Sequence, residues 1–239
     1  MYKTSVLLPL YNESETIEQT IVAVKEYAVK HSDFYFLFIN DGSTDGTGNI
    51  VKERIKDIGN ISMLELRANM GKASALKQAI KEVNSEYIVF NDGDMAYSMD
   101  HVDLVIDALK TSDIVIGNRK LGENSPRKVQ RFVAGEIFNR LARLLLGLDF
   151  TDTQAGIKGF KGSVAKKLFG LSIITDFAFD AELLYIAKQK GYSVALIPAK
   201  VNKAHRYSPS TIKVIRDSPG MFFSLIRMIF YRISGRYNG

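Results

Sequence analysis

The chain has 239 residues, of which 46% are hydrophobic, and this suits one large α/β domain or a domain with an appendage. It has no Cys, which excludes a disulfide framework and a Cys-based metal site and fits a reducing compartment, and its three scattered His residues argue against a zinc site. The formal net charge of +6 indicates an anionic partner, and charge alone leaves open whether this is a nucleotide, a phospholipid surface or a nucleic acid.

The first half of the chain alternates short apolar runs with helical patterns. The apolar runs predict strands at residues 5–9, 34–39, 61–66, 87–90 and 114–117. The segments between them predict helices at 14–31, at 73–83, at 102–110 and in a stretch that ends at 56. Because strands that alternate with helices build βαβ units, we predict a mostly parallel sheet flanked by helices.

The chain changes character after Arg119. Further along it, the sequence predicts a polar loop at 121–128, a helix at 129–148, a polar segment at 151–161, a helix at 180–190 and a strand at 194–198. Near the C-terminus, residues 221–233 are almost all apolar but include Arg227 and Arg232. Such a helix suits a membrane interface, a packed place in the core or a partner chain, and the sequence leaves these open.

The N-terminus places Tyr2 and Lys3 directly before the first predicted strand. We therefore expect no signal peptide. No run reaches the about 20 apolar residues that a membrane-spanning helix needs, so we expect a soluble or peripheral protein.

Polar loops follow the carboxyl ends of four predicted strands, at residues 11–13, 41–43, 69–72 and 92–94. In a doubly wound sheet such loops converge on one crevice. Asp41 can accept a hydrogen bond from a base or a ribose, and Lys72 can reach a phosphate as a point charge. Glycines in the same loops let backbone approach a ligand closely.

Asp92 and Asp94 follow the strand at 87–90 and stand one residue apart. Two carboxylates in this spacing can bind one hard divalent cation, Mg²⁺ or Mn²⁺, which would most naturally serve a diphosphate. The tripeptide alone is better interpreted as a solvated Asp-Gly-Asp turn. The three other compatible loops favour the metal site.

Three motifs, in this order, resemble family 2 of the inverting glycosyltransferases, which have the GT-A fold: LPLYNE at 8–13, NDGSTDGT at 40–47 and DGD at 92–94. Two further segments, DTQAGIKGF at 152–160 and FDAELL at 179–184, look like the branch that makes dolichyl- or polyprenyl-phosphate glucose and mannose. The resemblance spans nearly the whole chain.

The resemblance implies a fold and a division of the chain. The fold would be α/β of the GT-A type, with a Rossmann-like mixed, mostly parallel sheet flanked by helices and a C-terminal amphipathic helical tail. The catalytic domain would be 1–210, with a nucleotide-sugar-binding half at 1–119 and an acceptor-side half at 120–210. The basic amphipathic tail would be 211–239.

The resemblance also implies an activity: metal-dependent, inverting transfer of a hexose from a UDP-glucose or GDP-mannose type of donor to a polyprenyl or dolichyl phosphate. The cofactor would be Mg²⁺ or Mn²⁺. We expect a peripheral protein at the cytoplasmic face of a membrane, with a lipid-phosphate partner and no nucleic acid. Homo-oligomerisation stays open.

Roles on the donor side carry over onto matching positions. The nucleoside and diphosphate pocket would be lined by Pro9, Tyr11 and Glu13. Asp41 would contact the nucleoside, and Asp92 with Asp94 would form the metal-binding motif. One departure is Asn40, where many relatives have Asp, so one nucleoside contact would be made by an amide.

On the acceptor side, Arg119 would face the donor or acceptor phosphate, and residues 152–154 would border the sugar and the acceptor. The lipid phosphate would meet Arg206, Ser208, Ser210 and Lys213. Many relatives continue into C-terminal membrane-spanning helices, which this sequence lacks. That departure weakens the lipid-acceptor hypothesis more than the transferase hypothesis.

A phosphate acceptor and a hydroxyl acceptor make different demands. A phosphate monoester, with a second pKa of about 6, is largely ionised near neutral pH and needs no strong general base. A saccharide or other hydroxyl, as in cell-surface polysaccharide synthesis, needs one. The candidates are Asp152, Asp180 and Glu182. The last two also suit a helix start, so we favour Asp152.

Other classes fit less well. Residues 9–14 contain no glycine, whereas a nicotinamide dehydrogenase needs G-x-G-x-x-G after its first strand. A nucleotidyltransferase would need a Gly- and Arg-rich loop there. Basic residues such as Arg127, Lys128 and Arg131 are best interpreted as a solvated face, although a lipid phosphate would also suit them. A non-catalytic sugar-nucleotide sensor stays open.

Overall fold

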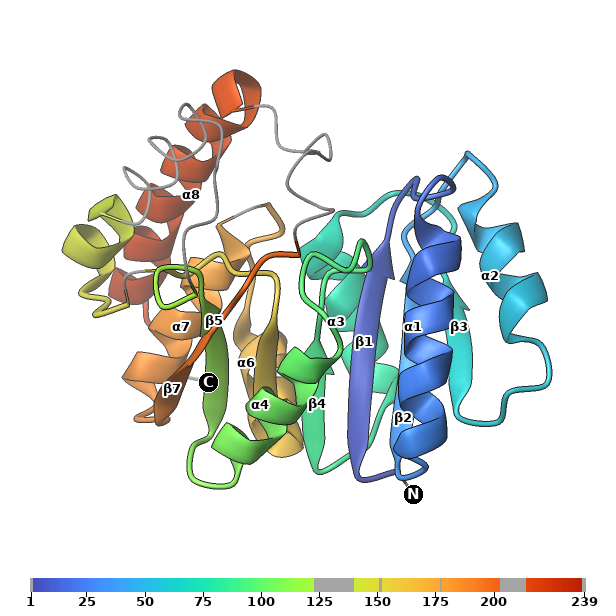
Figure 1. Ribbon diagram of the computed structural model, residues 1–239. Coiled ribbons are helices and arrows are strands. Elements are labelled where there is room, and N and C mark those ends of the chain that lie inside the picture. The colour runs from blue at the N-terminus through green and yellow to red at the C-terminus, as the bar shows by residue number, and fades with distance from the viewer. Residues whose placement is uncertain (1, 123–139, 151, 177, 203–213, 238–239) are drawn as a thin grey trace.

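The computed structural model describes residues 2–122, 140–150, 152–176, 178–202 and 214–237, and these build a seven-stranded sheet with helices on both faces (Figure 1). The strands are β1 (Thr4–Leu10), β2 (Phe34–Asn40), β3 (Ile61–Glu65), β4 (Tyr87–Phe90), β5 (Ile114–Asn118), β6 (Lys158–Lys161) and β7 (Val194–Pro198). The helices include α1 (Ile17–Lys30), α2 (Thr47–Ile55), α3 (Lys72–Glu82), α4 (Asp100–Leu109), α6 (Gly162–Leu171), α7 (Phe179–Gln189) and α8 (Val214–Ile233).

The strand order is β3-β2-β1-β4-β6-β5-β7. Every pair of neighbours is parallel except those that involve β6, which runs antiparallel to both β4 and β5. This confirms the predicted mixed, mostly parallel sheet. The parallel strands point their carboxyl ends to one edge, which is where an open α/β sheet binds ligands.

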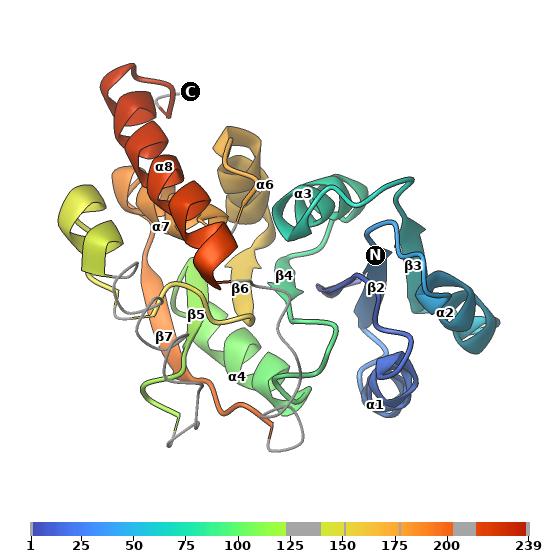
Figure 2. The same ribbon diagram turned by 90° about the horizontal axis from the view of Figure 1, so that it is seen from above.

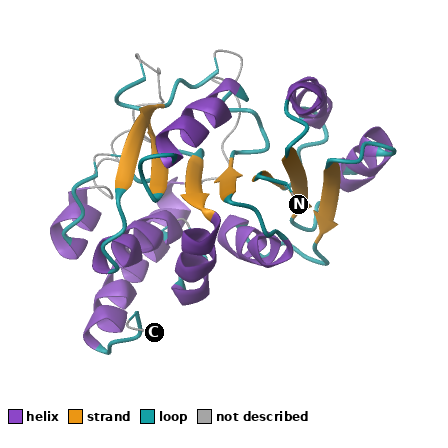
Figure 3. Cartoon of the chain, turned by 90° about the horizontal axis from the view of Figure 1, so that it is seen from below, coloured by secondary structure: helices purple, strands orange, loops and turns teal. Residues whose placement is uncertain are grey.

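Side chains of the sheet alternate between two cores. Leu7 of β1 belongs to the core that α3, α6, α7 and α8 cover, whereas Val6 and Leu8 belong to the core under α1, α2 and α4. Figures 2 and 3, seen from above and below, show the row of strands between these two layers of helices. Because β1, β2, β4 and β5 are buried on both faces, they appear in the sequence as continuous apolar runs.

The sequence did not predict β6 or α6. β6 consists of Lys-Gly-Phe-Lys and lies in the second half of a segment interpreted only as polar. Two lysines and a glycine hide the pattern of a buried strand, since neither residue type favours strands. The long crossover from β5 to β7 therefore contains a strand that lies between β4 and β5 and runs antiparallel to both.

Some boundaries differ from the prediction. α1 begins at Ile17 rather than at residue 14, because residues 13–16 form a turn in which the Thr16 N–H donates to the Glu13 carbonyl (3.0 Å). Residues 140–146 are helical, so the helix predicted to reach 148 ends earlier; its predicted first part, 129–139, lies outside the described residues.

The C-terminal helix is confirmed and is longer than the apolar run at 221–233 that indicated it, since α8 begins at Val214. Leu225 and Met228 are buried against the core that contains α7. None of the helices in the described ranges is long and apolar enough to cross a bilayer.

Candidate active site

Hydrogen bonds join the loop after β1 to the loop after β2. Asn12, at φ 54°, donates its N–H to Ser43 Oγ (2.9 Å) and accepts from the Thr44 N–H at Oδ1 (2.9 Å). The Glu13 N–H donates to Thr47 Oγ1 (2.9 Å). The two loops therefore form one continuous edge at the carboxyl ends of the strands.

The Asp41 carboxylate holds the loop after β3. It is almost completely buried, and its two oxygens accept from the N–H groups of Met70 (2.8 Å) and Gly71 (2.8 Å). Gly42 has φ +67°, and a Cβ there would overlap the Ala68 backbone, so this approach of the two loops requires glycine. Asp41 therefore shapes the site, and its contact with a nucleoside stays a prediction.

An ion pair links Lys72, at the start of α3, to Asp92, directly after β4. Both side chains are about 30% exposed. Burial raises the pKa of Asp92 although the charge of Lys72 opposes this, and the neighbouring carboxylates, Asp92 above all, raise the pKa of Lys72 against the effect of burial. A Cβ at Gly156 would overlap the Asp92 carboxylate, so a larger residue there would displace that side chain. All four predicted loops thus meet.

Asp94 lies two residues further on, partly exposed, with one oxygen accepting from the Ala96 N–H (3.0 Å). Across the described ranges no group of three or more His, Cys, Asp or Glu side chains forms a complete metal site. The two carboxylates nevertheless fit Mg²⁺ or Mn²⁺, since Mg²⁺ is usually held by one or two carboxylates together with substrate phosphates and water.

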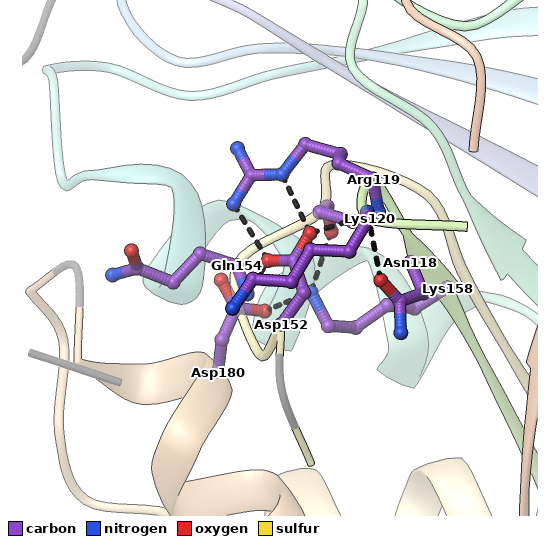
Figure 4. Close-up of polar contacts among 8 residues, drawn as sticks. Asn118, Arg119, Lys120, Asp152, Gln154, Lys158 and Asp180 are labelled. Carbon is purple, nitrogen blue, oxygen red and sulfur yellow. Dashed lines mark hydrogen bonds and ion pairs between the residues drawn. The ribbon is translucent and has the colours of Figure 1, made fainter. Parts of the chain in front are cut away.

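Arg119, which follows β5, is held by Asp152 in a bidentate pair (Figure 4). Arg119 Nε donates to Oδ2 (2.7 Å) and Nη2 to Oδ1 (2.6 Å). The backbone N–H of Arg119 also donates to Oδ2 (3.0 Å), and that of Gln154 to Oδ1 (3.3 Å). Although burial opposes it, Asp152 raises the pKa of Arg119, so the guanidinium stays charged.

This geometry bears on the role predicted for Asp152. Its carboxylate is 2% exposed and accepts four hydrogen bonds, two of them from a cation. Both oxygens of the carboxylate are thus already engaged by the Arg119 guanidinium and by backbone N–H groups. The contacts support a positioning role toward Arg119 better than a role as general base.

Lys158, in β6, is a site residue that the sequence analysis missed. Its ammonium is buried, pairs with Asp180 of α7 (2.7 Å) and donates to the Ala155 carbonyl (2.6 Å) (Figure 4). It lies 5.5 Å from the centre of the Phe90 ring, which Lys72 also approaches, at 5.4 Å. Burial lowers the pKa of Lys158, against the charge of Asp180. An acidic residue at the start of α7 and a lysine between apolar residues were the available signals.

Glu182, another candidate base, contacts a different part of the molecule. It is fully buried and accepts from the N–H groups of Ile173 (3.0 Å) and Ile174 (2.9 Å) and from Tyr237 Oη (2.8 Å). Burial raises the pKa of Glu182. These contacts give it a structural role between α6 and the end of the chain.

The remaining predicted residues fall into two groups. Pro9 is the second-last residue of β1, and Tyr11 is the first residue of the loop that follows. Tyr11 is 38% exposed. Those assigned to the lipid phosphate or to a solvated face lie outside the described residues: Arg206, Ser208, Ser210, Lys213, Arg127, Lys128 and Arg131.

The chain is similar to proteins of known class. Dolichyl-phosphate beta-glucosyltransferase ALG5D of Trichomonas vaginalis is 28% identical over 96% of this chain and 74% of its own length. Glycosyltransferase AglD of Haloferax volcanii is 27% identical over 94% of this chain but only 36% of its own length. This chain therefore spans most of the first relative and about a third of the second.

A solved structure has the same fold. Glucosyl-3-phosphoglycerate synthase from Mycobacterium tuberculosis, in complex with uridine diphosphate, matches with a TM-score of 0.72 at 18% identity, over 95% of this chain and 80% of that one. The model of the family described as Glycosyl transferase family 2 matches residues 5–169. Since that match covers more than half of the sequence, the chain belongs to glycosyl transferase family 2 and is a glycosyltransferase.

Proposed function

We propose that the protein transfers a hexose, with inversion, from a nucleotide sugar of the UDP-glucose or GDP-mannose type to a polyprenyl or dolichyl phosphate. The observation that carries the proposal is that each candidate general base is already engaged. Asp152 is paired with Arg119, Asp180 with Lys158, and Glu182 with backbone N–H groups. A phosphate acceptor needs no base, whereas a hydroxyl acceptor does.

The similarity to dolichyl-phosphate beta-glucosyltransferases supports the same acceptor. The phosphate oxygen attacks the anomeric carbon from the face opposite to the nucleotide. The bond from that carbon to the diphosphate oxygen breaks, and its electron pair leaves with the nucleoside diphosphate. No proton has to move, since the attacking oxygen is already ionised near neutral pH.

The chain's own residues bind and orient both phosphates. Lys72 is placed to reach the donor diphosphate, and Arg119, fixed by Asp152, presents a charged guanidinium to the donor or acceptor phosphate. Pro9, Tyr11, Glu13 and Asp41 line the nucleoside side. Asp94, with Asp92, would hold Mg²⁺ or Mn²⁺, which when bound stabilises the negative charge that develops on the leaving diphosphate.

A nucleotide-release assay tests the proposal. Purified protein is given UDP-glucose or GDP-mannose, with Mg²⁺, Mn²⁺ or EDTA, and with or without a short polyprenyl phosphate in detergent. We expect nucleotide release that depends on the lipid phosphate and on the metal, with the labelled sugar recovered in the organic phase. Nucleotide release only with a saccharide or other hydroxyl acceptor would overturn the lipid-phosphate acceptor. The absence of any release would favour a role in binding the nucleotide sugar without catalysis.

The proposed acceptor also implies a location in the cell. A polyprenyl phosphate is held in a bilayer, and a nucleotide sugar is a soluble donor. The protein would therefore work as a peripheral protein at the cytoplasmic face of a membrane. Fractionation of cells that express the tagged chain, followed by a high-salt wash, tests this placement.

A further inference from the structure

α8 is apolar on two opposite sides. Its inner side is buried in the core and includes Ser224, Leu225 and Met228, which are at most 2% exposed. Five other large apolar side chains of α8 are between 45% and 79% exposed, and we call them the outer face of α8: Phe222, Phe223, Ile226, Phe230 and Ile233. A helix that only packs on its own domain needs one apolar side.

The spacing of the outer face makes it continuous. At 3.6 residues per turn, positions 222, 226, 230 and 233 follow one another along the helix, and 223 lies beside them. The five side chains fall within an arc of about 100°, which is the width of a face that is normally buried. Figures 1 and 2 show α8 at the margin of the molecule, with the sheet and α7 on its inner side.

Two contacts fix the orientation of α8. Ser224 Oγ donates to the Asp176 carboxylate, just before α7. At the other end, Tyr237 Oη donates to the buried Glu182 (2.8 Å). Because these hydrogen bonds attach both ends of residues 224–237 to the rest of the domain, the outer face cannot turn inward without breaking them.

Positive charges lie at one edge of the outer face. Arg227 follows Phe223 by four residues on the helix surface, and Arg227 and Arg236 lie over the Tyr231 ring, with guanidinium carbons 5.8 and 5.9 Å from its centre. The sequence contains no Asp or Glu from residue 220 to its end. Exposed aromatic and aliphatic side chains flanked by arginines are typical of helices that lie in the headgroup region of a bilayer.

We propose that the outer face of α8 binds the surface of an anionic phospholipid bilayer, with the apolar side chains inserted between acyl chains and the arginines on the lipid headgroups. A second copy of the chain suits this face less well, because pairing two such faces brings like charges together without an acidic partner. This inference deepens the proposed function, since it names the surface that would bring the site to a lipid-held acceptor.

Vesicle flotation tests the proposal without any donor or turnover. The full chain is mixed with vesicles of phosphatidylcholine alone or with about a third phosphatidylserine. We expect the protein to float with the anionic vesicles, to bind neutral ones far more weakly, and to be released as salt rises. The double variant Phe223→Ser/Phe230→Ser should bind at least about tenfold more weakly, since each phenylalanine then loses its apolar insertion.

Val29→Ser is the matched control, since Val29 is 85% exposed on α1, away from α8. It should leave vesicle binding unchanged, and all variants should unfold at the temperature of the native chain. Equal binding of the double variant and the native chain overturns the proposal. So does a dimer, seen by analytical ultracentrifugation, that the double variant loses while vesicles bind neither protein. Turnover in detergent is a separate measurement, so a failure here is distinct from a failure of the proposed function.

Discussion

Asp94 carries the sharpest prediction about a single residue. Asp94→Ala should abolish metal-dependent turnover, because it removes one of the two carboxylates at the end of β4, and the other, Asp92, is already paired with Lys72. The folded state should persist, since a partly exposed side chain is removed. Nucleotide release with Mg²⁺ or Mn²⁺, together with a thermal melt, measures both.

Asp107→Ala on α4 is the matched control, because the Asp107 side chain is 70% exposed and pairs with Lys110 on the surface. It should leave turnover unchanged. If Asp94→Ala kept most activity with normal metal dependence, Asp94 would not be the metal-binding residue.

The buried ion pair of Lys158 and Asp180 gives a prediction about stability, because a buried charge is costly when its partner is removed. Lys158→Met should destabilise the fold by about 3 to 5 kcal/mol, because it leaves Asp180 buried without its cation. The double variant Lys158→Met/Asp180→Leu should be more stable than either single variant, since no unpaired charge remains. Urea unfolding of the four proteins gives the coupling. Strictly additive losses would mean that the two side chains act independently.

Among the elements, three strands are joined at one end by Asp113, which precedes β5. Its carboxylate accepts from the N–H (3.0 Å) and the Oγ (2.8 Å) of Ser193, before β7, and from Lys161 of β6 (3.0 Å). These hydrogen bonds, those from Ser193 first, lower the pKa of Asp113. Because this pKa is depressed in the folded state, the stabilisation is present above the ordinary Asp value of about 3.9 and is lost as pH falls through the folded value.

Asp113→Asn should therefore lower the free energy of unfolding by about 1 kcal/mol at pH 7, through weakened hydrogen bonds at a site that is partly exposed. The difference from the native chain should shrink as pH falls below the ordinary Asp value of about 3.9 and the native carboxyl also becomes protonated. Denaturant unfolding at several pH values checks this. If the difference in the free energy of unfolding stayed constant with pH, the loss of stability would come from altered packing at residue 113 and not from the lost carboxylate charge.

The elements that the sequence predicted are those with a strong local pattern. Five of the strands are continuous apolar runs, and the amphipathic helices between them have the helical period. β6 has no such pattern, and its place depends on pairing with β4 and β5, which are remote in sequence. For the same reason Asp152 and Arg119 were each predicted as site residues but their ion pair was not, because only the folded sheet brings the two together.

For the whole molecule, metal binding and nucleotide binding should depend on each other. The described residues offer no complete metal site, so the ion needs the diphosphate oxygens, and the diphosphate needs the ion to balance its charge. Together, at about 100 times the dissociation constant, they should stabilise the fold by about 2.7 kcal/mol. For a chain of this size that raises the melting temperature by roughly 5 to 10 °C, and either one alone should raise it much less. Thermal melts with UDP or GDP, each with Mn²⁺, Mg²⁺ or EDTA, measure the shift and show which base is preferred. A full shift with metal alone would contradict the argument, because the protein would then supply a complete set of ligands by itself.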